Sequence, residues 1–460
     1  MDIAEVTAFL YALKPSGIRF GLESTRLVLE RLARPDRRFD AIHLAGSNGK
    51  GSTAAFLESI LMKAGLRVGL YSSPHLVEFR ERFRVDGQPV DDALVAEQAE
   101  RMLLDGLELQ PAEIALWLRR DRVIDRMQAQ SWYRERGGAS RFCGLTFFEA
   151  STVLACLIFA RAGVELALME CGMGGRLDAT NVLAPRLAVV TPVQLEHTAY
   201  LGDTLSAIAA EKAGIIKART PTVCARQSHD ARRVLEHLAR ERRAPFFLAG
   251  RDFAADGSWR EARFRAGGER IGPVRLGLVG PHQLLNAETA VGCLPQLGWL
   301  AGRLGPERIA RGLESASWPG RLERFGARGE WILDGAHNPD GVRALVAALG
   351  DLLGGKKPIV VFGVLADKQV EPMLDALVPL ASRLVLVRPA DARGRDPAEL
   401  AGHLARAGAP FSLGGSVADA LRGLHPVPGD SCVVVTGSLT VVGEARAWLL
   451  AGVGAGQGAA

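Results

Sequence analysis

The sequence has few cysteines, and no two of them lie close together. None forms a C-x-x-C pair or a spacing typical of metal ligands. Isolated thiols of this kind are typical of reduced cysteines in a cytosolic protein. The pattern therefore favours neither a disulfide framework nor a cysteine-based metal site. The six are Cys143, Cys156, Cys171, Cys224, Cys293 and Cys432.

Long hydrophobic runs are also absent. No apolar run approaches the ~18 residues that a membrane-spanning helix needs. The first residues, M-D-I-A-E-V, begin acidic and lack the basic-then-apolar pattern of a targeting segment. The sequence predicts a cytoplasmic protein without a membrane partner.

A large excess of one charge sign is missing as well. The 56 basic and 51 acidic residues give a net charge of +5, and the basic residues are spread along the chain. Nucleic-acid binding, which needs a concentrated basic surface, is not indicated. With 48% hydrophobic and 23% charged residues, the 460-residue chain has the composition of a soluble globular enzyme. Its length suits two large α/β domains or about three smaller ones.

The sequence does contain a strand, a glycine-rich turn and a helix in that order, within A-I-H-L-A-G-S-N-G-K-G-S and the residues that follow. Residues 41–45 form a buried-strand pattern, and the apolar residues of 56–61 recur at helical spacing. Such a turn presents free backbone N–H groups and the positive end of a helix dipole, which suits phosphate. Lys50 adds a point charge, and Ser52 is a candidate magnesium ligand.

This turn departs from the general P-loop pattern. The stretch from Gly46 to Gly49 is too short, and Gly51 intervenes between Lys50 and Ser52. An ordinary glycine-rich strand-to-helix turn is the alternative. Because Lys50 and Ser52 are both in place, a variant phosphate loop is the better interpretation.

Three further strand-then-loop units follow, so a doubly wound, mostly parallel sheet is predicted. Ligands collect at the carboxyl ends of such strands, where Ser73, Glu170, Asp178, Glu196 and His197 are expected. His197 could instead be a hydrogen-bonded structural residue. The strands are expected at 67–71, 166–170 and 187–191.

Two other candidates have equally plain alternatives. Glu149 begins an apolar helix over 145–163, where a buried acid would need a partner such as a metal, although an exposed helix-start glutamate is as good an interpretation. Lys212, in A-A-E-K-A-G-I, reads as a surface lysine. The polar stretch 90–141, with a dense charged patch at 119–127, favours a solvated helical insertion.

A second, smaller α/β domain of Rossmann-like alternation is expected after a hinge. Small antiparallel strands are predicted within 244–279, and the hinge lies within 298–320, so the division is 1–300 and 301–460. The loops D-G-A-H-N-P-D and T-G-S-L-T follow strands of this second domain and give it a polar edge. Its strands are expected at 331–333, 359–362, 384–387 and 431–436, and its helices at 341–353, 370–380, 398–407 and 439–450.

The order of the motifs carries more information than any one of them. A-G-S-N-G-K-G-S, Y-S-S-P-H-L, L-T-F-F-E, E-C-G-M-G-G-R-L-D-A-T-N, L-E-H-T, E-K-A-G-I, H-Q-L-L-N-A, P-G-R-L-E and D-G-A-H-N-P follow one another. Together they resemble the bifunctional bacterial folylpolyglutamate synthase and dihydrofolate synthase family, which belongs to the ATP-dependent Mur-ligase-like amide ligases. The resemblance covers about residues 7 to 450.

The resemblance implies that ATP phosphorylates a dihydropteroate or folate carboxylate and that L-glutamate then attacks the acyl phosphate. It implies ATP as co-substrate and two Mg²⁺ sites, with Ser73 and Glu149 at one and Glu149 and His197 at the other. The implied catalytic residues are Lys50, Glu149, His197 and Lys212, the last as a carbamylated lysine. The implied ATP-binding residues are Ser47, Asn48, Gly49, Lys50, Gly51, Ser52, Asn286, Arg321 and Asp334.

The resemblance also implies a set of substrate contacts, and the protein is expected to be a monomer. The contacts are Gly174, Gly175, Arg176 and Asp178 near the pterin-bearing substrate, and His337 and Ser438 near the incoming glutamate. One departure is Glu196, where the family commonly has L-D-H. Three alternatives stay open: another Mur-type amino-acid ligase, a P-loop ATPase that couples hydrolysis to motion or regulation, and a non-catalytic folate-binding relative.

Overall fold

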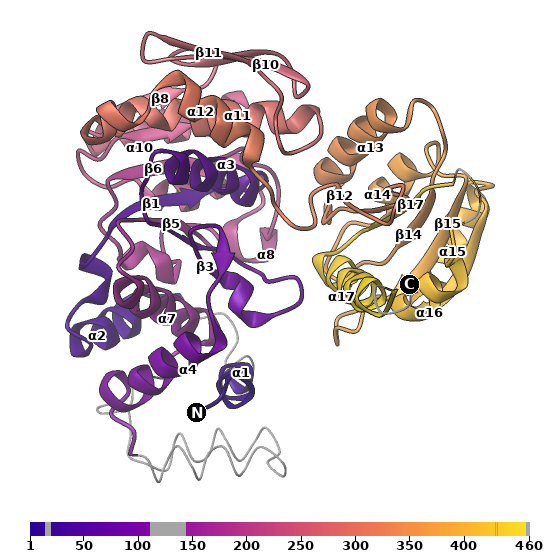
Figure 1. Ribbon diagram of the computed structural model, residues 1–460, viewed down its shortest axis with the longest axis horizontal. Coiled ribbons are helices and arrows are strands. Elements are labelled where there is room, and N and C mark those ends of the chain that lie inside the picture. Colours follow the sequence, from indigo (N-terminus) through magenta and orange to yellow (C-terminus); the bar gives the residue numbers. More distant parts are fainter. Residues whose placement is uncertain (14–19, 111–143, 428, 430, 457–460) are drawn as a thin grey trace.

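The computed structural model describes residues 1–13, 20–110, 144–427, 429 and 431–456, and side chains only up to residue 452. The turn expected near Pro15, the charged stretch around residues 119–127 and Cys143 lie outside the described residues. The described chain forms two bodies, each built on its own sheet (Figure 1). A large cavity is lined by residues of both bodies.

The first body is built on an eight-stranded sheet that is parallel from β2 to β8, with β3 and β4 added antiparallel at one edge. The predicted doubly wound, mostly parallel sheet is therefore confirmed. The central strands are buried on both faces, as expected of a parallel sheet covered by helices. In sheet order the strands are β4 (Gln88–Pro89), β3 (Phe83–Val85), β2 (Val68–Tyr71), β5 (Leu166–Glu170), β1 (Asp40–Ala45), β6 (Leu187–Val190), β7 (Thr222–Cys224) and β8 (Phe246–Leu248).

Helices cover both faces of this sheet because successive strand residues point to opposite sides. Ile42 and Leu44 pack toward one helical layer, whereas Ala41 packs toward the other. The first layer contains α3 (Lys50–Lys63), α11 (Pro281–Cys293) and α12 (Pro306–Ser315). The second contains α1 (Ile3–Ala12), α2 (Glu23–Arg31), α4 (Asp92–Arg101) and α7 (Phe147–Ala162) (Figure 1). Near β6–β8 lie α8 (Thr198–Leu201), α9 (Leu205–Lys212) and α10 (His229–Glu241).

The small antiparallel strands predicted within 244–279 are also confirmed. They are β9 (Ala254–Ser258), β10 (Glu261–Ala266) and β11 (Glu269–Val274), which form a three-stranded sheet. Their buried side chains join the core that contains α11 and α12. This sheet therefore extends the first body above α11 and α12 (Figure 1).

The second body is a six-stranded sheet in which only β12 runs antiparallel. Its predicted strands and helices are confirmed, and β12 and β16 are additional edge strands. In sheet order the strands are β12 (Glu323–Phe325), β13 (Trp331–Leu333), β17 (Val433–Thr436), β14 (Ile359–Phe362), β15 (Arg383–Arg388) and β16 (Phe411–Ser416). One face packs α13 (Pro339–Leu353), α14 (Glu371–Leu377) and α15 (Pro397–Arg406), and the other packs α16 (Val417–Leu424) and α17 (Leu439–Gly456).

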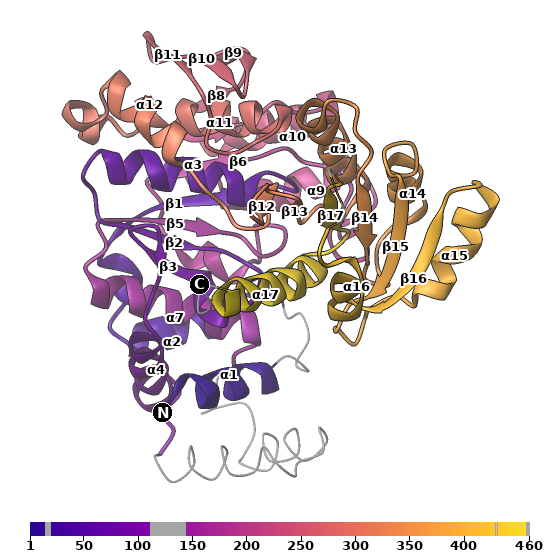
Figure 2. The same ribbon diagram turned by 45° about the vertical axis from the view of Figure 1, so that its right-hand side comes forward.

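The two bodies touch through α17 and the loop that follows β2. Figure 2 shows α17 running from the second sheet toward the first body. A Cβ on Gly443 would lie only 2.0 Å from the carbonyl oxygen of Leu76, so a glycine permits this close approach. The division of domains at residue 300 remains a prediction. Because α12 packs against α3, we propose that the boundary falls after α12.

None of the helices in the described ranges is both long enough and apolar enough to cross a bilayer.

Candidate active site

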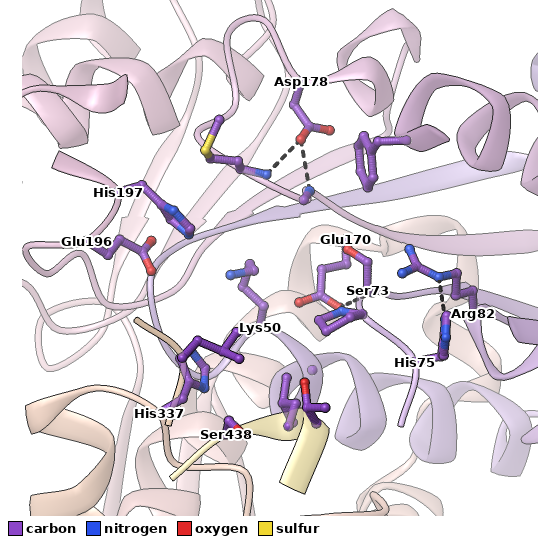
Figure 3. A pocket seen from close by; sticks show the side chains of 18 of the residues that line it. Lys50, Ser73, His75, Arg82, Glu170, Asp178, Glu196, His197, His337 and Ser438 are labelled. Carbon is purple, nitrogen blue, oxygen red and sulfur yellow. Dashed lines mark hydrogen bonds between the residues drawn. The ribbon is translucent and has the colours of Figure 1, made fainter. Parts of the chain in front are cut away.

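A cavity of about 820 Å³ lies where the carboxyl ends of both sheets face each other (Figure 3). It gathers most of the predicted site residues, from segments up to 391 positions apart. Those that line it are Ser47, Asn48, Gly49, Lys50, Gly51, Ser52, Ser73, Glu149, Asp178, His197, Arg321, His337 and Ser438. Those outside the lining are Gly174, Gly175, Arg176, Lys212, Asn286 and Asp334.

The phosphate loop joins β1 to α3. At two of its positions the backbone conformation or a close neighbour leaves room only for glycine. Gly49 has φ +85°, a left-handed conformation that side chains rarely adopt. A Cβ there would lie 2.4 Å from Oδ1 of Asn286. Asn286 therefore supports the loop from α11 although it does not line the cavity.

Gly51, the residue that breaks the general phosphate-loop pattern, packs against the linker between the two bodies. A Cβ at this position would lie 2.9 Å from Nε1 of Trp318 and 3.1 Å from the neighbouring ring carbon. The unusual glycine thus makes room for an indole from a segment almost 270 residues away. The guanidinium of Arg84 lies over the same indole, 5.1 Å from the ring centroid.

Lys50 is the first residue of α3, and its side chain folds back over the loop. Its Nζ donates to the carbonyl oxygens of Gly46 at 2.8 Å and Ser47 at 3.3 Å. The ammonium lies between Glu170 and Glu196 and favours the ionised form of both (Figure 3). A lysine in this place can stabilise charge on a bound phosphate.

Glu196 and Lys212 form a buried ion pair at one end of the cavity. Nζ of Lys212 donates to Oε1 of Glu196 at 2.7 Å, and the Lys212 side chain is only 2% exposed. Burial opposes ionisation of Glu196, but the charges of Lys212 and Lys50 outweigh it and lower its pKa to about 2. Burial lowers the pKa of Lys212 and Glu196 opposes that change. Lys212 is therefore no surface lysine, and it reaches the cavity through Glu196.

The three predicted metal ligands line the cavity from separate elements. Glu149 is buried and completes a capping box at the start of α7, where its Oε2 accepts from the backbone N of Thr146 at 2.7 Å. Ser73 follows β2, and exposed His197 precedes α8 with φ +47°. Within the described ranges no three His, Cys, Asp or Glu residues are grouped closely enough to form a ready-made metal site.

Glu170, at the end of β5, is a cavity residue to which the sequence assigned a place but no role. Burial raises the pKa of this carboxyl group, and Lys50 and the backbone N of Ser73 oppose the rise. No ion-pair partner of Glu170 lies within 4 Å among the residues that the structure describes. A buried carboxylate that accepts from the backbone N of Ser73 is the kind of oxygen donor that Mg²⁺ prefers, so the chemistry of the residues present fits that ion.

Arg82 also lines the cavity and had no signal in the sequence, because E-F-R-E-R-F-R resembles an ordinary charged surface. It is only 6% exposed. Its Nε donates to Nδ1 of His75 at 2.9 Å, and its guanidinium lies 5.0 Å from the centroid of the Phe147 ring. It forms the end of the cavity opposite Glu196 (Figure 3).

The loop after β5 divides its predicted substrate residues between two surfaces. Asp178 faces the cavity and accepts hydrogen bonds from the backbone N atoms of Gly172 and Met173, both at 2.9 Å. Gly174, Gly175 and Arg176 lie on the side toward α8 and α9, where Arg176 pairs with Glu211 at 2.8 Å. A substrate contact by these three residues remains a prediction.

The second body supplies the opposite wall. Nδ1 of His337 lies 2.8 Å from the carbonyl oxygen of Gly335, and burial lowers its pKa to about 4. Asp334 lies behind this wall and accepts from the backbone N atoms of Leu322 and Ala336, both at 3.0 Å. It therefore holds the linker and the D-G-A-H-N-P loop together.

One hydrogen bond joins the phosphate loop directly to the second body. Nδ2 of Asn338 donates to Oδ1 of Asn48 at 3.1 Å. Asn48 also donates to Gln194, whose backbone carbonyl accepts from the Ser47 hydroxyl at 3.1 Å. The loops after β1, β6 and β13 thus form one polar network at the cavity.

Comparison with known families assigns both bodies. Residues 130–294 match the Mur ligase middle domain, and residues 320–439 match the Mur ligase glutamate ligase domain. The first match includes β5 to β8, and the second includes the D-G-A-H-N-P loop.

Curated relatives narrow the family further. A probable bifunctional folylpolyglutamate synthase/dihydropteroate synthase of Haloferax volcanii is 37% identical over 97% of this chain, which spans 50% of that protein's length. The folylpolyglutamate synthase of Lacticaseibacillus casei is 32% identical over 98% of this chain and 100% of its own length. The chain therefore spans about half of the first relative and the whole of the second.

Solved structures share the fold over nearly the whole chain. Escherichia coli FolC in complex with DHPP and ADP has a TM-score of 0.81 and 29% identity, covering 97% of this chain and 98% of its own. The bifunctional enzyme of Yersinia pestis complexed with AMPPNP and a Mn ion has a TM-score of 0.80 and 29% identity, covering 98% of both chains. The chain belongs to the folylpolyglutamate synthase/dihydrofolate synthase family of Mur-type ATP-dependent glutamate ligases.

Proposed function

We propose that this protein is an ATP-dependent ligase that adds L-glutamate to dihydropteroate, to folate polyglutamates, or to both. The observation that carries the proposal is the hydrogen bond between Asn48 and Asn338, which brings a phosphate loop and a second-domain loop to one cavity. A ligase needs such an arrangement, because the phosphorylated acid and the amine must meet away from water.

The reaction proceeds in two balanced steps. An oxygen of the substrate carboxylate attacks the γ-phosphorus of ATP, and ADP leaves. The glutamate amine then attacks the acyl carbon, the nitrogen loses a proton, and phosphate departs with the electrons of its bond to carbon. Catalysis of this kind depends on positioning and charge stabilisation rather than on a covalent protein nucleophile.

In this proposal the first wall holds the nucleotide. The loop from Ser47 to Ser52 binds the phosphates with its backbone N–H groups, and Lys50 stabilises the transferred charge. Asn286, Arg321 and Asp334 secure the nucleotide from the side of α11 and the linker. Magnesium, held by Ser73, Glu149 and His197 at two sites, would neutralise phosphate oxygens.

We further propose that Lys212 is carbamylated when a cation lies nearby. Carbon dioxide adds to a neutral amine, and burial lowers the pKa of Lys212 in the direction that favours this form. A carbamate would place a second anion beside Glu196, now 2.7 Å away. Because two neighbouring anions repel, we expect the modification only with a cation nearby. Intact-mass measurement with and without bicarbonate and Mg²⁺ tests this; no labile adduct under any condition would contradict it.

The second wall receives the amino acid. His337 and Ser438 are proposed to contact glutamate, and the pteroate part lies along Asp178 and the loop after β5. The protein is further proposed to act as a cytoplasmic monomer, for which light scattering of the purified protein is the test of oligomeric state.

The deciding experiment measures ADP formation with ATP, Mg²⁺ and L-glutamate, offered in parallel with dihydropteroate, tetrahydrofolate or a muramyl nucleotide. Stimulation by either pteridine supports the proposal, and stimulation by both establishes bifunctionality. Stimulation by the muramyl nucleotide alone would favour another Mur-type ligase, consistent with the domain matches. Phosphate release that needs no acceptor would identify an ATPase instead.

A further inference from the structure

A buried polar cluster lies directly behind the loop after β5, and two of its three members, His43 and Thr180, do not line the cavity. It consists of His43 from β1, Thr180 from the short helical turn Ala179–Val182, and Asp178, which precedes that turn. His43 and Thr180 are fully buried. Burying polar groups in a core costs free energy unless they form hydrogen bonds with one another.

The three side chains form a chain of hydrogen bonds. Nε2 of His43 lies 2.8 Å from Oγ1 of Thr180, which lies 2.5 Å from Oδ1 of Asp178. The Cys171 sulfur lies 3.1 Å from the same His43 nitrogen. A hydroxyl has one proton to donate, so the direction of donation along the chain matters.

The direction follows from the other nitrogen of His43. Nδ1 is buried and has no hydrogen-bond partner among the described residues. If it carried the proton, a buried N–H donor would be left without an acceptor, which is rare in native structures. The proton therefore belongs on Nε2, which donates to Thr180, and Thr180 donates to Asp178. Burial, with the charge of Lys217, lowers the His43 pKa to about 3, which keeps the ring neutral.

Asp178 is the member that reaches the cavity. Its Oδ2 accepts from the backbone N atoms of Gly172 and Met173, and its Oδ1 accepts from the backbone N and the hydroxyl of Thr180. These four bonds use all the lone pairs of a carboxylate. The carboxylate thus ties the beginning of the loop to its end and sets the position of the wall formed by Met173, Leu177 and Ala179.

We propose that His43 is a positioning residue that acts through Thr180 to orient Asp178 and the pteroate-facing wall of the cavity. The inference rests on the proposed function for the identity of the substrate. His43 lies on β1, three residues before Gly46, where the phosphate loop begins. The strand that leads into the phosphate loop therefore also anchors the loop after β5, which faces the acid substrate in the proposed function. The structure thereby couples the two substrate loops through one buried side chain.

The first test removes the Thr180 hydroxyl. Thr180→Val keeps the shape of the side chain and loses the relay, whereas Thr180→Ser keeps the hydroxyl. Thr222→Val, another fully buried threonine of the same body, is the matched control. We expect Thr180→Val to raise KM for dihydropteroate on the order of tenfold, the effect of one lost buried hydrogen bond, with KM for ATP unchanged. Thr180→Ser should remain near the parent value.

The second test addresses His43 itself. The amide nitrogen of His43→Gln can replace the Nε2 donor, whereas His43→Leu cannot, so the glutamine variant should rescue dihydropteroate KM. The effects of His43→Leu and Thr180→Val should not add in the double variant, because they break the same chain. Additive effects, equal changes in the two KM values, or a Thr180→Val change no larger than that of Thr222→Val would overturn the proposal.

A readout without substrate separates this proposal from the proposed function. Amide hydrogen exchange at residues 172–173 should accelerate in Thr180→Val and not in Thr180→Ser, since those amides donate to Asp178. If the parent protein is not stimulated by either pteridine, the proposed function fails while this measurement still decides the relay. Unchanged exchange in Thr180→Val would sink the relay even in an active enzyme.

Discussion

The two walls of the cavity carry opposite balances of charge. The wall from the eight-stranded sheet has four carboxylates and two cations, whereas the wall from the linker and the six-stranded sheet has three cations and two carboxylates. A wall with excess carboxylates attracts a divalent cation, and one with excess cations attracts the carboxylates of an amino acid. The first wall comprises Glu149, Glu170, Asp178, Glu196, Lys50 and Arg82, and the second Arg321, Lys368, Arg393, Asp391 and Glu444.

The walls also differ in rigidity. On the first, Lys212 and Glu196 form a pair that is nearly excluded from solvent, and Asp178 is held by four hydrogen bonds. On the second, Lys368 pairs with Asp367 at 2.9 Å in a partly exposed setting. Exposed pairs hold geometry weakly. The first wall is therefore preorganised by buried contacts, and we expect the second wall to adjust more readily when a ligand binds.

We expect the largest change in activity when one lysine of the first wall is removed, and a different change when one lysine of the second wall is removed. Lys50→Ala should lower kcat by a factor on the order of 100, as removal of other preorganised charge stabilisers does. Lys368→Ala should chiefly raise KM for glutamate, by about tenfold. Steady-state ADP formation checks both, with exposed Lys63→Ala as the control. Similar kcat losses in the two lysine variants would erase the distinction between the walls.

A smaller effect is expected in the pH dependence of stability, which depends on His43 behind the first wall. In the unfolded chain His43 takes up a proton near pH 6.5, but in the folded chain only near 3. The unfolded state therefore binds more protons between these values, and the stability is complete above pH 6.5 and lost as pH falls. At pH 5 the parent should have lost about 2 kcal/mol that His43→Gln retains. Chemical unfolding at pH 7.5 and 5 measures this, and exposed His229→Gln should follow the parent. A constant difference between parent and His43→Gln would refute it.

A third prediction loosens the connection between the walls. Asn338→Asp keeps the cap of α13, because a carboxylate can still accept from the Gly341 backbone N, but it loses the donor to Asn48. We expect kcat/KM to fall roughly tenfold with Tm unchanged. Asn338→Ala, which removes cap and donor together, should also lower Tm. Activity equal to the parent in Asn338→Asp would show that the walls meet without this bond.

The smallest expected effect lies far from the cavity, where the three-stranded sheet touches α13. Asp351 accepts from Nε1 of Trp259 at 2.9 Å and pairs with Arg260 at 2.5 Å, and the charged side chains are about half exposed. Asp351→Asn should change KM for glutamate by about twofold at low salt and less at high salt. The exposed Asp256→Asn on β9 is the control. An effect that grows with salt would contradict a screened contact between the bodies.

Sequence patterns predicted the parts of this protein that obey local rules. The strands at 166–170, 331–333 and 359–362 are found at the predicted residues because buried parallel strands are continuous apolar runs. The phosphate loop was recognisable, despite its irregular spacing, because a glycine-rich turn between a buried strand and a helix start is typical of phosphate binding. The short edge strands β4 and β12 were not predicted from the sequence, since exposed short strands lack a continuous apolar run.

The missed site residues depend on contacts between distant segments. Arg82 is buried by Phe147 and His75, which only the folded chain brings together. The interpretation of Lys212 as a surface lysine was wrong, because its partner Glu196 lies in a loop that precedes α8, whereas Lys212 ends α9. His43, three residues before the phosphate loop, was read as one more strand residue because nothing local indicates Thr180 as its partner.

The contact of Gly51 with Trp318 has a practical consequence for anyone who recombines this protein with its relatives. The Trp318 indole fills the space that a side chain at position 51 would need, so the two residues have to be inherited together although one lies in the first body and the other in the linker. A chimera that takes its first body from a protein with a side chain at position 51 would push the indole away and shift the linker. Exchanging the two halves therefore calls for transferring the glycine and the tryptophan together.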